Sequence, residues 1–220
     1  MTLPGTTQSA LSGVSGFDTD TVLTGPSAAQ LRGSGFRFCV RYVSLDAPGP
    51  GDLSHGEALS ILDAGLALMP VQHVRSAGWA PTAELGSAYG VAAATNVRTV
   101  GFPVGVNVWC DLEGIASTVS AEAVVSYCNA WYEAVSESGY VPGLYVGAAA
   151  VLTGEQLYYE LKFQHYWKSA SSVPNVAVRG YQLIQAGPDT TADGVEIDTA
   201  ATQTDRSGGQ VLWLTTATGA

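Results

Sequence analysis

The sequence predicts an α/β fold: a single (β/α)8-type TIM barrel in which some helices are reduced to loops. Short apolar segments alternate with helical segments along most of the chain, the order that right-handed βαβ units give around a parallel sheet. The chain has 220 residues, 46% of them hydrophobic, which suits one barrel at the short end of the usual size range. Acidic residues recur directly after separate predicted strands, where a barrel places its active site.

The chain divides into a short polar beginning and one domain. Residues 1–13 are polar, and we expect a flexible N-terminal segment there. Residues 14–220 show neither an internal repeat nor a linker, so we expect them to form a single barrel domain.

The first half of this domain contains predicted strands separated by helices. The segment 36–43 is the clearest of these strands, since it is apolar except for Arg37 and Arg41. A loop rich in Pro and Gly follows at 46–54, and Gly65 ends the next helix. The predicted strands are 16–18, 36–43, 66–72 and 104–110, with helices at 27–32, 55–64 and 82–96 between them.

The second half opens with the clearest helix of the chain. Ser120 is suited to cap it, and Glu122 lies in its positively polarised first turn. Apolar side chains follow at spacings of three and four up to Val135, and Gly139 provides the stop. The remaining predicted strands are 142–147, 164–168, 178–185, 194–198 and 211–214, with a helix at 154–161.

Residues 106–114, Val-Asn-Val-Trp-Cys-Asp-Leu-Glu-Gly, carry the strongest functional signal. Side chains two apart on a strand share a face, so Asp111 and Glu113 should project together from its C-terminal end, and Gly114 lets the chain turn. Only 13% of the residues are charged, which argues against the alternative of an acidic, solvated loop. Two carboxyl groups, one holding a proton and one charged, are what hydrolysis of a glycosidic bond requires.

Further acids and aromatic groups fall at the ends of other predicted strands. Asp18 ends the first strand and Asp198 ends the strand at 194–198. Tyr145, Trp167 and Gln185 occupy corresponding positions, and rings beside carboxylates suit a groove that binds sugars through their C–H faces. The alternative for Tyr145 and Trp167 is that they fill the core.

Composition and the lack of targeting segments argue against several partners and locations. A net charge of −10 and a pI near 4.5 argue against nucleic acid or an anionic membrane surface. The N-terminus lacks the basic region of a Sec signal peptide, and no apolar run reaches the roughly 20 residues that span a bilayer. We therefore expect a protein that is cytoplasmic when made and reaches the cell wall through phage lysis or a secretion machine.

Motifs for other chemistries are absent from the sequence. There is no His-Glu-x-x-His, no Walker loop and no Gly-x-Ser-x-Gly, and the three cysteines lack metal or redox spacing. We therefore expect neither a metal nor a cofactor.

The ordered motifs resemble those of a known group of barrels. Gly-Phe-Asp at 16–18, Asp-Leu-Glu at 111–113, Gly-Leu-Tyr-Val-Gly at 143–147, Leu-Ile-Gln at 183–185 and Ile-Asp at 197–198 are similar, in this order, to glycoside-hydrolase-like barrels related to family 25 lysozymes. Arg41-Tyr42 and Trp167-Lys168 resemble an uncharacterised bacterial branch of that group. The resemblance extends from about residue 14 to residue 200.

The resemblance implies roles for individual residues. Glu113 would be the catalytic acid, and Asp18, Asp111 and Asp198 would be supporting carboxylates. Asp20 departs from the lysozyme pattern, which usually has serine two residues after the first acid, and it adds a negative charge. We expect the substrate to contact Asp20, Arg41, Tyr145, Trp167 and Gln185.

The expected reaction is cleavage of a β-1,4 glycosidic bond in a glycan. The expected glycan is peptidoglycan, cleaved after N-acetylmuramic acid as a muramidase does. Repulsion from neighbouring acids would raise the pKa of Glu113 and keep its proton available near neutral pH. Asp111 would orient the substrate's N-acetyl group, or Asp18 or Asp198 would orient a water; the sequence leaves these routes open. Crowding also predicts that at least one acid titrates well above about 4.

A non-enzymatic interpretation also fits the sequence. The chain would then be a non-catalytic carbohydrate-binding or structural barrel module of a phage particle or contractile injection machine. The presence of all four expected acids, Asp18, Asp111, Glu113 and Asp198, favours the enzyme.

Overall fold

The computed structural model describes residues 1–187 and 190–216; residues 188–189 and 217–220 of the predicted domain lie outside the described residues. Its strands are β1 (Thr6–Ser9), β2 (Ser15–Thr19), β3 (Phe38–Val43), β4 (Ala67–Gln72), β5 (Asn107–Leu112), β6 (Val141–Val146), β7 (His165–Lys168), β8 (Leu183–Gln185), β9 (Thr190–Ala192), β10 (Val195–Thr202) and β11 (Leu212–Thr215). Its helices are α1 (Gly25–Gly33), α2 (His55–Asp63), α3 (Ala83–Val100), α4 (Ala121–Glu137) and α5 (Gly154–Tyr159).

Eight of the described strands close into a barrel, which confirms the predicted fold class. The hydrogen-bonded order is β2-β3-β4-β5-β6-β7-β8-β10, and β10 pairs with β2 to complete the ring. The neighbours from β2 to β8 are parallel, as the alternation of strands and helices predicts. This arrangement brings the C-terminal ends of seven parallel strands to one mouth.

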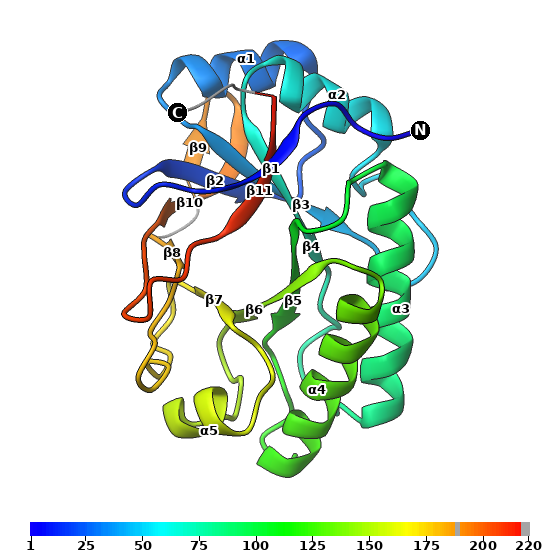
Figure 1. Cartoon of the computed structure of the whole chain (residues 1–220), viewed down its shortest axis with the longest axis vertical. Coiled ribbons are helices and arrows are strands. Elements are labelled where there is room, and N and C mark those ends of the chain that lie inside the picture. Colours follow the sequence, from blue (N-terminus) through cyan, green and yellow to red (C-terminus); the bar gives the residue numbers. More distant parts are fainter. Residues whose placement is uncertain (188–189, 217–220) are drawn as a thin grey trace.

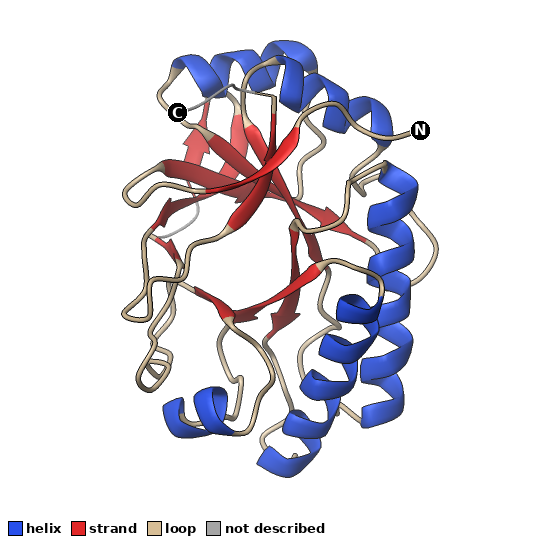
Figure 2. Ribbon diagram, in the orientation of Figure 1, coloured by secondary structure: helices blue, strands red, loops and turns tan. Residues whose placement is uncertain are grey.

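The helices cover only part of the barrel wall. Helices α1 to α5 each connect two successive parallel strands, and Figures 1 and 2 show them around the top, right and bottom of the view. Each begins at a Ser or Thr whose side chain accepts a backbone N–H of the first turn, as the cap of α4 at Ser120 was predicted to do. The segment 169–182, between β7 and β8, contains no helix.

The barrel wall separates two apolar layers. Outward-facing strand residues such as Cys39, Val108 and Leu144 pack with residues of the helices. Inward-facing residues fill the barrel itself: Phe38, Val40, Ala67, Met69, Val71, Trp109, Trp167, Leu183 and Ala200. Because side chains alternate along a strand, each inward row continues at the mouth, where Tyr42 follows Val40 and Asp111 follows Trp109.

The direction of one barrel strand contradicts the prediction of an all-parallel sheet. β10 is antiparallel to both of its barrel neighbours, β2 and β8. The chain does not cross the barrel after β8; β9 pairs antiparallel with the first half of β10, and the chain turns between them at Asp193 and Gly194 and returns through β10. The first half of β10 therefore lies at the mouth, and Asp198 reaches the site from there rather than from the C-terminal end of a parallel strand.

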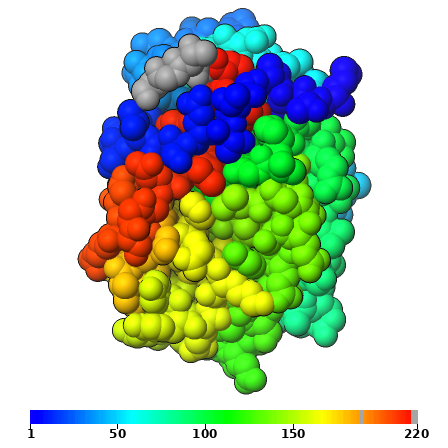
Figure 3. Space-filling view, viewed as in Figure 1, coloured from blue at the N-terminus to red at the C-terminus, as the bar shows by residue number. Residues whose placement is uncertain are grey.

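Two further strands cover the opposite end of the barrel. β11 pairs with β4 at Leu68, near that strand's start, and places the Trp213 ring 5.7 Å from the ring of Phe38. β1 adds to the other edge of β11, so residues 6–9, within the segment expected to be flexible, form a regular strand. Figure 3 shows the N-terminal segment, in blue, crossing this face beside red segments from the C-terminal part of the chain.

Candidate active site

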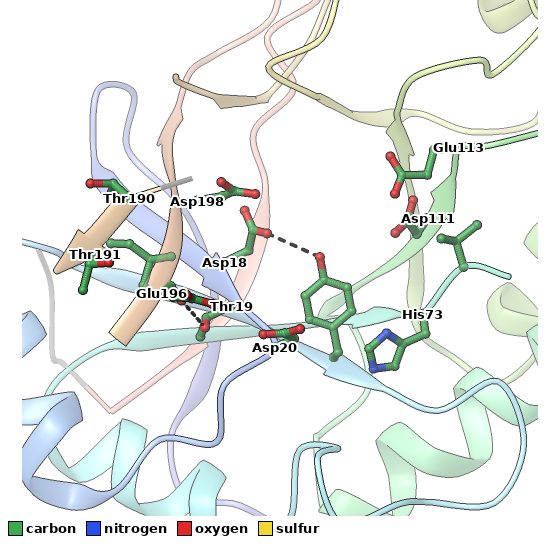
Figure 4. A pocket seen from close by; sticks show the side chains of 13 residues that line it. Asp18, Thr19, Asp20, His73, Asp111, Glu113, Thr190, Thr191, Glu196 and Asp198 are labelled. Carbon is green, nitrogen blue, oxygen red and sulfur yellow. Dashed lines mark hydrogen bonds between the residues drawn. The ribbon is translucent and has the colours of Figure 1, made fainter. Parts of the chain in front are cut away.

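The barrel mouth contains a cavity of about 490 Å³. Figure 4 shows carboxylate side chains projecting into it from separate strands. The lining residues are Asp18, Thr19, Asp20, Tyr42, His73, Val74, Asp111, Glu113, Thr190, Thr191, Glu196, Ile197 and Asp198. The four acids that the sequence assigns to catalysis therefore meet at one cavity.

Asp111 and Glu113 project from β5 and its end, on the face that strand alternation predicts. Asp111 is 7% exposed, whereas Glu113 is only partly buried. The Glu113 carbonyl accepts a hydrogen bond from the Trp79 indole at 2.8 Å, and Gly114 then turns the chain with a φ of 64°. These contacts fix the backbone that carries the proposed acid.

The glycines of the Gly-Leu-Tyr-Val-Gly motif leave space for β5 side chains. A Cβ at Gly143 would lie 2.4 Å from Cε3 of Trp109, and a Cβ at Gly147 would lie 2.4 Å from Cβ of Glu113. β6 and the residue that follows it therefore carry no side chain at the two positions where the Trp109 ring and Glu113 lie against them.

Asp18 and Asp198 lie on the side of the cavity opposite Asp111 and Glu113 (Figure 4), and they are directly paired in the β2–β10 register. Gln185 links them: its amide nitrogen donates to Oδ2 of Asp198 at 2.7 Å and to Oδ2 of Asp18 at 3.3 Å. The Gln185 oxygen accepts from the Tyr145 hydroxyl at 3.0 Å. Gln185 is 8% exposed, so it positions the two acids from below, and Tyr145 holds it in place.

An aromatic pair, Tyr42 and His73, also lines the cavity. The two rings stack with centroids 4.6 Å apart, and the Tyr42 hydroxyl donates to Oδ1 of Asp18 at 3.4 Å. Nε2 of His73 lies 3.4 Å from Oδ1 of Asp52. Sequence reasoning missed both as lining residues, although the inward parity of Phe38 and Val40 on β3 would have placed Tyr42 at the mouth.

Burial governs the protonation of the cavity acids. It raises the pKa of Asp111 well above the usual range, with smaller contributions from Glu113 and Asp18. It also raises the pKa of Asp18, to which the charge of Asp198 adds, and it raises the pKa of Glu113. The crowding of acids in the sequence predicts raised pKa values through like-charge repulsion. Desolvation by burial is instead the larger cause at each of these three acids.

Asp20 and Glu196 add exposed carboxylates to the rim of the cavity. Both lie close to Thr19, which precedes Asp20 in the chain and donates its hydroxyl to the Glu196 carbonyl at 2.6 Å (Figure 4). No Lys or Arg is among the described residues that line the cavity. Burial lowers the pKa of His73, so that side chain is neutral near pH 7.

Two predicted substrate contacts are wrong. Arg41 faces outward from β3 and is 0% exposed; it pairs with Glu57 of α2 at 2.7 Å and donates to the Thr19 carbonyl. Trp167 is 1% exposed and packs inside the barrel, its ring centroid 4.6 Å from that of Tyr145. The alternative of core filling therefore holds for Trp167.

Among the described residues, no helix is both long and apolar enough to cross a membrane, and no group of His, Cys, Asp and Glu has an arrangement that could hold a metal ion.

Comparison with known proteins supports the resemblance seen in the motifs. A family model described as an Rv2525c-like, glycoside hydrolase-like domain matches residues 29–211. No curated protein matches the chain.

Solved structures share the fold at low sequence identity. An uncharacterised protein of B. stearothermophilus is 21% identical, with 86% of this chain and 96% of that chain covered and a TM-score of 0.68. The Tat-secreted protein Rv2525c of Mycobacterium tuberculosis is 18% identical, with coverages of 88% and 96% and a TM-score of 0.65. A family 25 glycosyl hydrolase of Bacillus anthracis is 14% identical, with coverages of 87% and 89% and a TM-score of 0.58.

Proposed function

Because this chain belongs to the family of Rv2525c-like, glycoside hydrolase-like domains, we propose that it cleaves a β-1,4 glycosidic bond with Glu113 as general acid. The observation that carries the proposal is the meeting of Glu113, Asp111, Asp18 and Asp198 at one cavity of the barrel mouth. Carboxyl groups at separate strand ends can act on opposite sides of a bond, which glycoside hydrolysis requires.

Glu113 donates its proton to the oxygen of the leaving sugar. Partial burial raises its pKa, so a larger fraction of it is protonated near neutral pH than of an exposed glutamate. Asp111 lies beside it and orients the substrate through hydrogen bonds, since burial raises its pKa well above the usual range and disfavours its charged form.

Asp18 and Asp198 orient the attacking water from the opposite side of the cavity. Gln185 holds both carboxylates, and Tyr42 donates to Asp18, so the pair is positioned before substrate binds. An acid and a base on opposite sides with room for water between them give inversion at the sugar carbon. The anomer first released, measured by NMR, should therefore be the inverted one.

The glycan we propose as substrate is peptidoglycan, and the protein acts at the cell wall. The similar protein of M. tuberculosis is Tat-secreted, and we propose that this chain also reaches the wall after synthesis in the cytoplasm, by secretion or by lysis of the producing cell. Detection of the protein in the wall fraction of intact producing cells would support secretion, whereas its confinement to lysed cultures would support lysis.

Glu113→Gln tests the proposal on purified peptidoglycan. The substitution keeps the shape of the side chain and removes the proton, so dye release should fall about 10²- to 10⁴-fold, the usual value of general acid catalysis. Glu122→Gln, at an exposed position of α4, is the matched control and should behave as wild type. If wild type binds glycan but releases no product, the chain is a binding module and the proposal is wrong.

A further inference from the structure

The cavity has a strong excess of acidic side chains over basic ones. Six carboxyl side chains line it, from Asp18, Asp20, Asp111, Glu113, Glu196 and Asp198, and no Lys or Arg is among its described lining residues. We propose that the cavity binds its glycan through a glucosamine unit whose amine is free and positively charged, rather than N-acetylated. This inference deepens the proposed function, because it names the sugar that the hydrolase recognises.

Asp111 gives independent evidence for a ligand that donates hydrogen bonds. Its carboxyl group is directed into the cavity in Figure 4, it is 7% exposed, and its Oδ1 accepts no hydrogen bond from the described residues. Asp18, by contrast, accepts from Tyr42 and Gln185. An unpartnered buried carboxyl oxygen is costly, and an ammonium group supplies three donors together with the opposite charge.

The remaining lining favours a sugar over a simple cation. Tyr42 and His73 form a stacked aromatic pair at the cavity, and Val74 and Ile197 add apolar surface. The lining is mostly polar, and these few aromatic and apolar side chains supply the surface against which the C–H face of a sugar ring can pack. A volume of about 490 Å³ lies within the range of small-molecule sites, roughly 300–1,000 Å³.

The rim acids extend this preference beyond the catalytic groups. Asp20 and Glu196 are exposed and take no part in the proposed bond cleavage, yet they add two negative charges at the entrance. The same field repels an acidic sugar. Within a peptidoglycan strand, this subsite would therefore take a de-N-acetylated glucosamine and not the acidic muramic unit.

Binding without turnover tests the inference. In the Glu113→Gln background, titration calorimetry would compare a β-1,4-linked glucosamine tetramer, its fully N-acetylated counterpart and spermine, a flexible polyamine without rings. The measurement is made in acidic buffer at about pH 5.5, so that the sugar amines carry their positive charge. The glucosamine tetramer should bind about tenfold or more tightly than either comparison ligand, and equal affinity for the N-acetylated tetramer would overturn the proposal. Equal binding of spermine would also overturn it, because charge alone would then explain the affinity.

A variant of the two rim acids tests whether the preference for glucosamine arises in this cavity. Asp20→Asn with Glu196→Gln should weaken binding of the glucosamine tetramer by up to about fivefold per charge, the scale of exposed ion pairs, and leave the N-acetylated tetramer unaffected. Glu137→Gln, an exposed position on α4, is the control. An unchanged affinity for the glucosamine tetramer in the rim variant would contradict the assignment.

Two further comparisons are needed. One distinguishes a wall glycan from a glucosamine homopolymer as the source of the amine, and the other distinguishes failure of this inference from failure of the proposed hydrolase activity. Soluble peptidoglycan fragments, before and after chemical de-N-acetylation, would show whether a wall glycan or only a glucosamine homopolymer binds. Cleavage of N-acetylated glycan by wild type without preference for the amine would reject this inference and keep the hydrolase. Tight binding of the amine without any cleavage would reject the hydrolase and keep the inference.

Discussion

Inward-facing side chains change from apolar to polar within two residues of the barrel mouth. On β5 the inward row passes from Trp109 to Asp111, and on β3 from Val40 to Tyr42. The apolar members exclude water beneath the cavity, which is why burial raises the pKa of Asp111 and Glu113. Single positions on a few strands thus determine both the shape and the protonation of the site.

Gly147→Ala should displace Glu113 without removing it. The added Cβ would lie 2.4 Å from Cβ of Glu113 and 2.6 Å from its Oε2, so that side chain must move. A displacement of about 1 Å can lower kcat by roughly 10²-fold, and we expect a loss of that order together with a loss of about 1–3 kcal/mol in the free energy of unfolding from overpacking. Gly56→Ala, where a Cβ meets no atom within 4 Å, is the control for kinetic assays. Full activity in Gly147→Ala would contradict the position assigned to Glu113.

The sequence predicts some of these residues better than others. The face shared by Asp111 and Glu113 follows from strand alternation alone. Arg41 and Trp167 fit the same motifs, but whether a strand position faces the helices or the barrel interior depends on register that a single sequence leaves open. His73 directly follows β4 and has the same parity as its inward-facing residue Val71, so strand alternation places it at the mouth as it does Tyr42, once the inward face of the strand is known.

At the scale of elements, a buried ion pair fixes α2 to the barrel wall. Nε of Arg41 on β3 lies 2.7 Å from Oε1 of Glu57 on α2, and Glu57 also accepts from the Leu23 N–H. Arg41 further donates to the carbonyl of Thr19, directly before the rim acid Asp20. The pair therefore connects β3, α2 and the end of β2 beneath one side of the cavity.

Glu57→Gln should destabilise the protein strongly. It leaves the guanidinium buried without its counter-charge, and removing one partner of such a pair costs about 3–5 kcal/mol in the free energy of unfolding. Urea unfolding would measure the loss. The exposed pair of Glu133 and Lys162 is the comparison, since Glu133→Gln should cost about 1 kcal/mol or less. Equal losses in the two variants would show that the Arg41 pair is not isolated from water.

The elements themselves were largely predictable, but the direction of one was not. Alternating apolar residues mark a strand in either direction, so the segment at 194–198 gave no sign that β10 is antiparallel. Its direction follows from the tight turn at Asp193 and Gly194, which joins it to the antiparallel β9. Likewise, residues 6–9 form a strand only because β11 offers them an edge, and that edge lies at the other end of the chain.

The whole molecule should show a characteristic dependence of stability on pH. The pKa values of Asp18, Asp111 and Glu113 are raised by burial, so their contribution to stability is present below about 4 and is lost as pH rises through the folded values. Burial lowers the pKa of His73, and that of His165 to about 4, so their contribution is present above about 6.5 and is lost as pH falls. The two trends oppose each other between those limits.

Thermal melts of Asp111→Asn and wild type isolate the contribution of the Asp111 carboxyl group to the pH dependence of stability. The histidines are the same in both proteins, so the difference in Tm reports the carboxyl group alone. Asp111→Asn should gain stability relative to wild type as pH rises above about 4, and the gain should level off above the raised folded pKa of Asp111, because wild type must then ionise a buried group. A difference in Tm that does not change with pH would mean that Asp111 ionises in the folded protein as easily as in the unfolded one.

The central claim, that Glu113 supplies a proton to a leaving sugar, is tested most directly by changing the leaving group. Glycosides with a dinitrophenol leaving group need little protonation, whereas a natural sugar leaving group depends on it. The measurement is the ratio of kcat/KM for Glu113→Gln to that of wild type on an oligosaccharide and on its dinitrophenyl counterpart. We predict a loss of about 10²- to 10⁴-fold on the oligosaccharide and near-normal activity on the activated glycoside. An equal loss on both substrates, or no loss on either, would contradict the account.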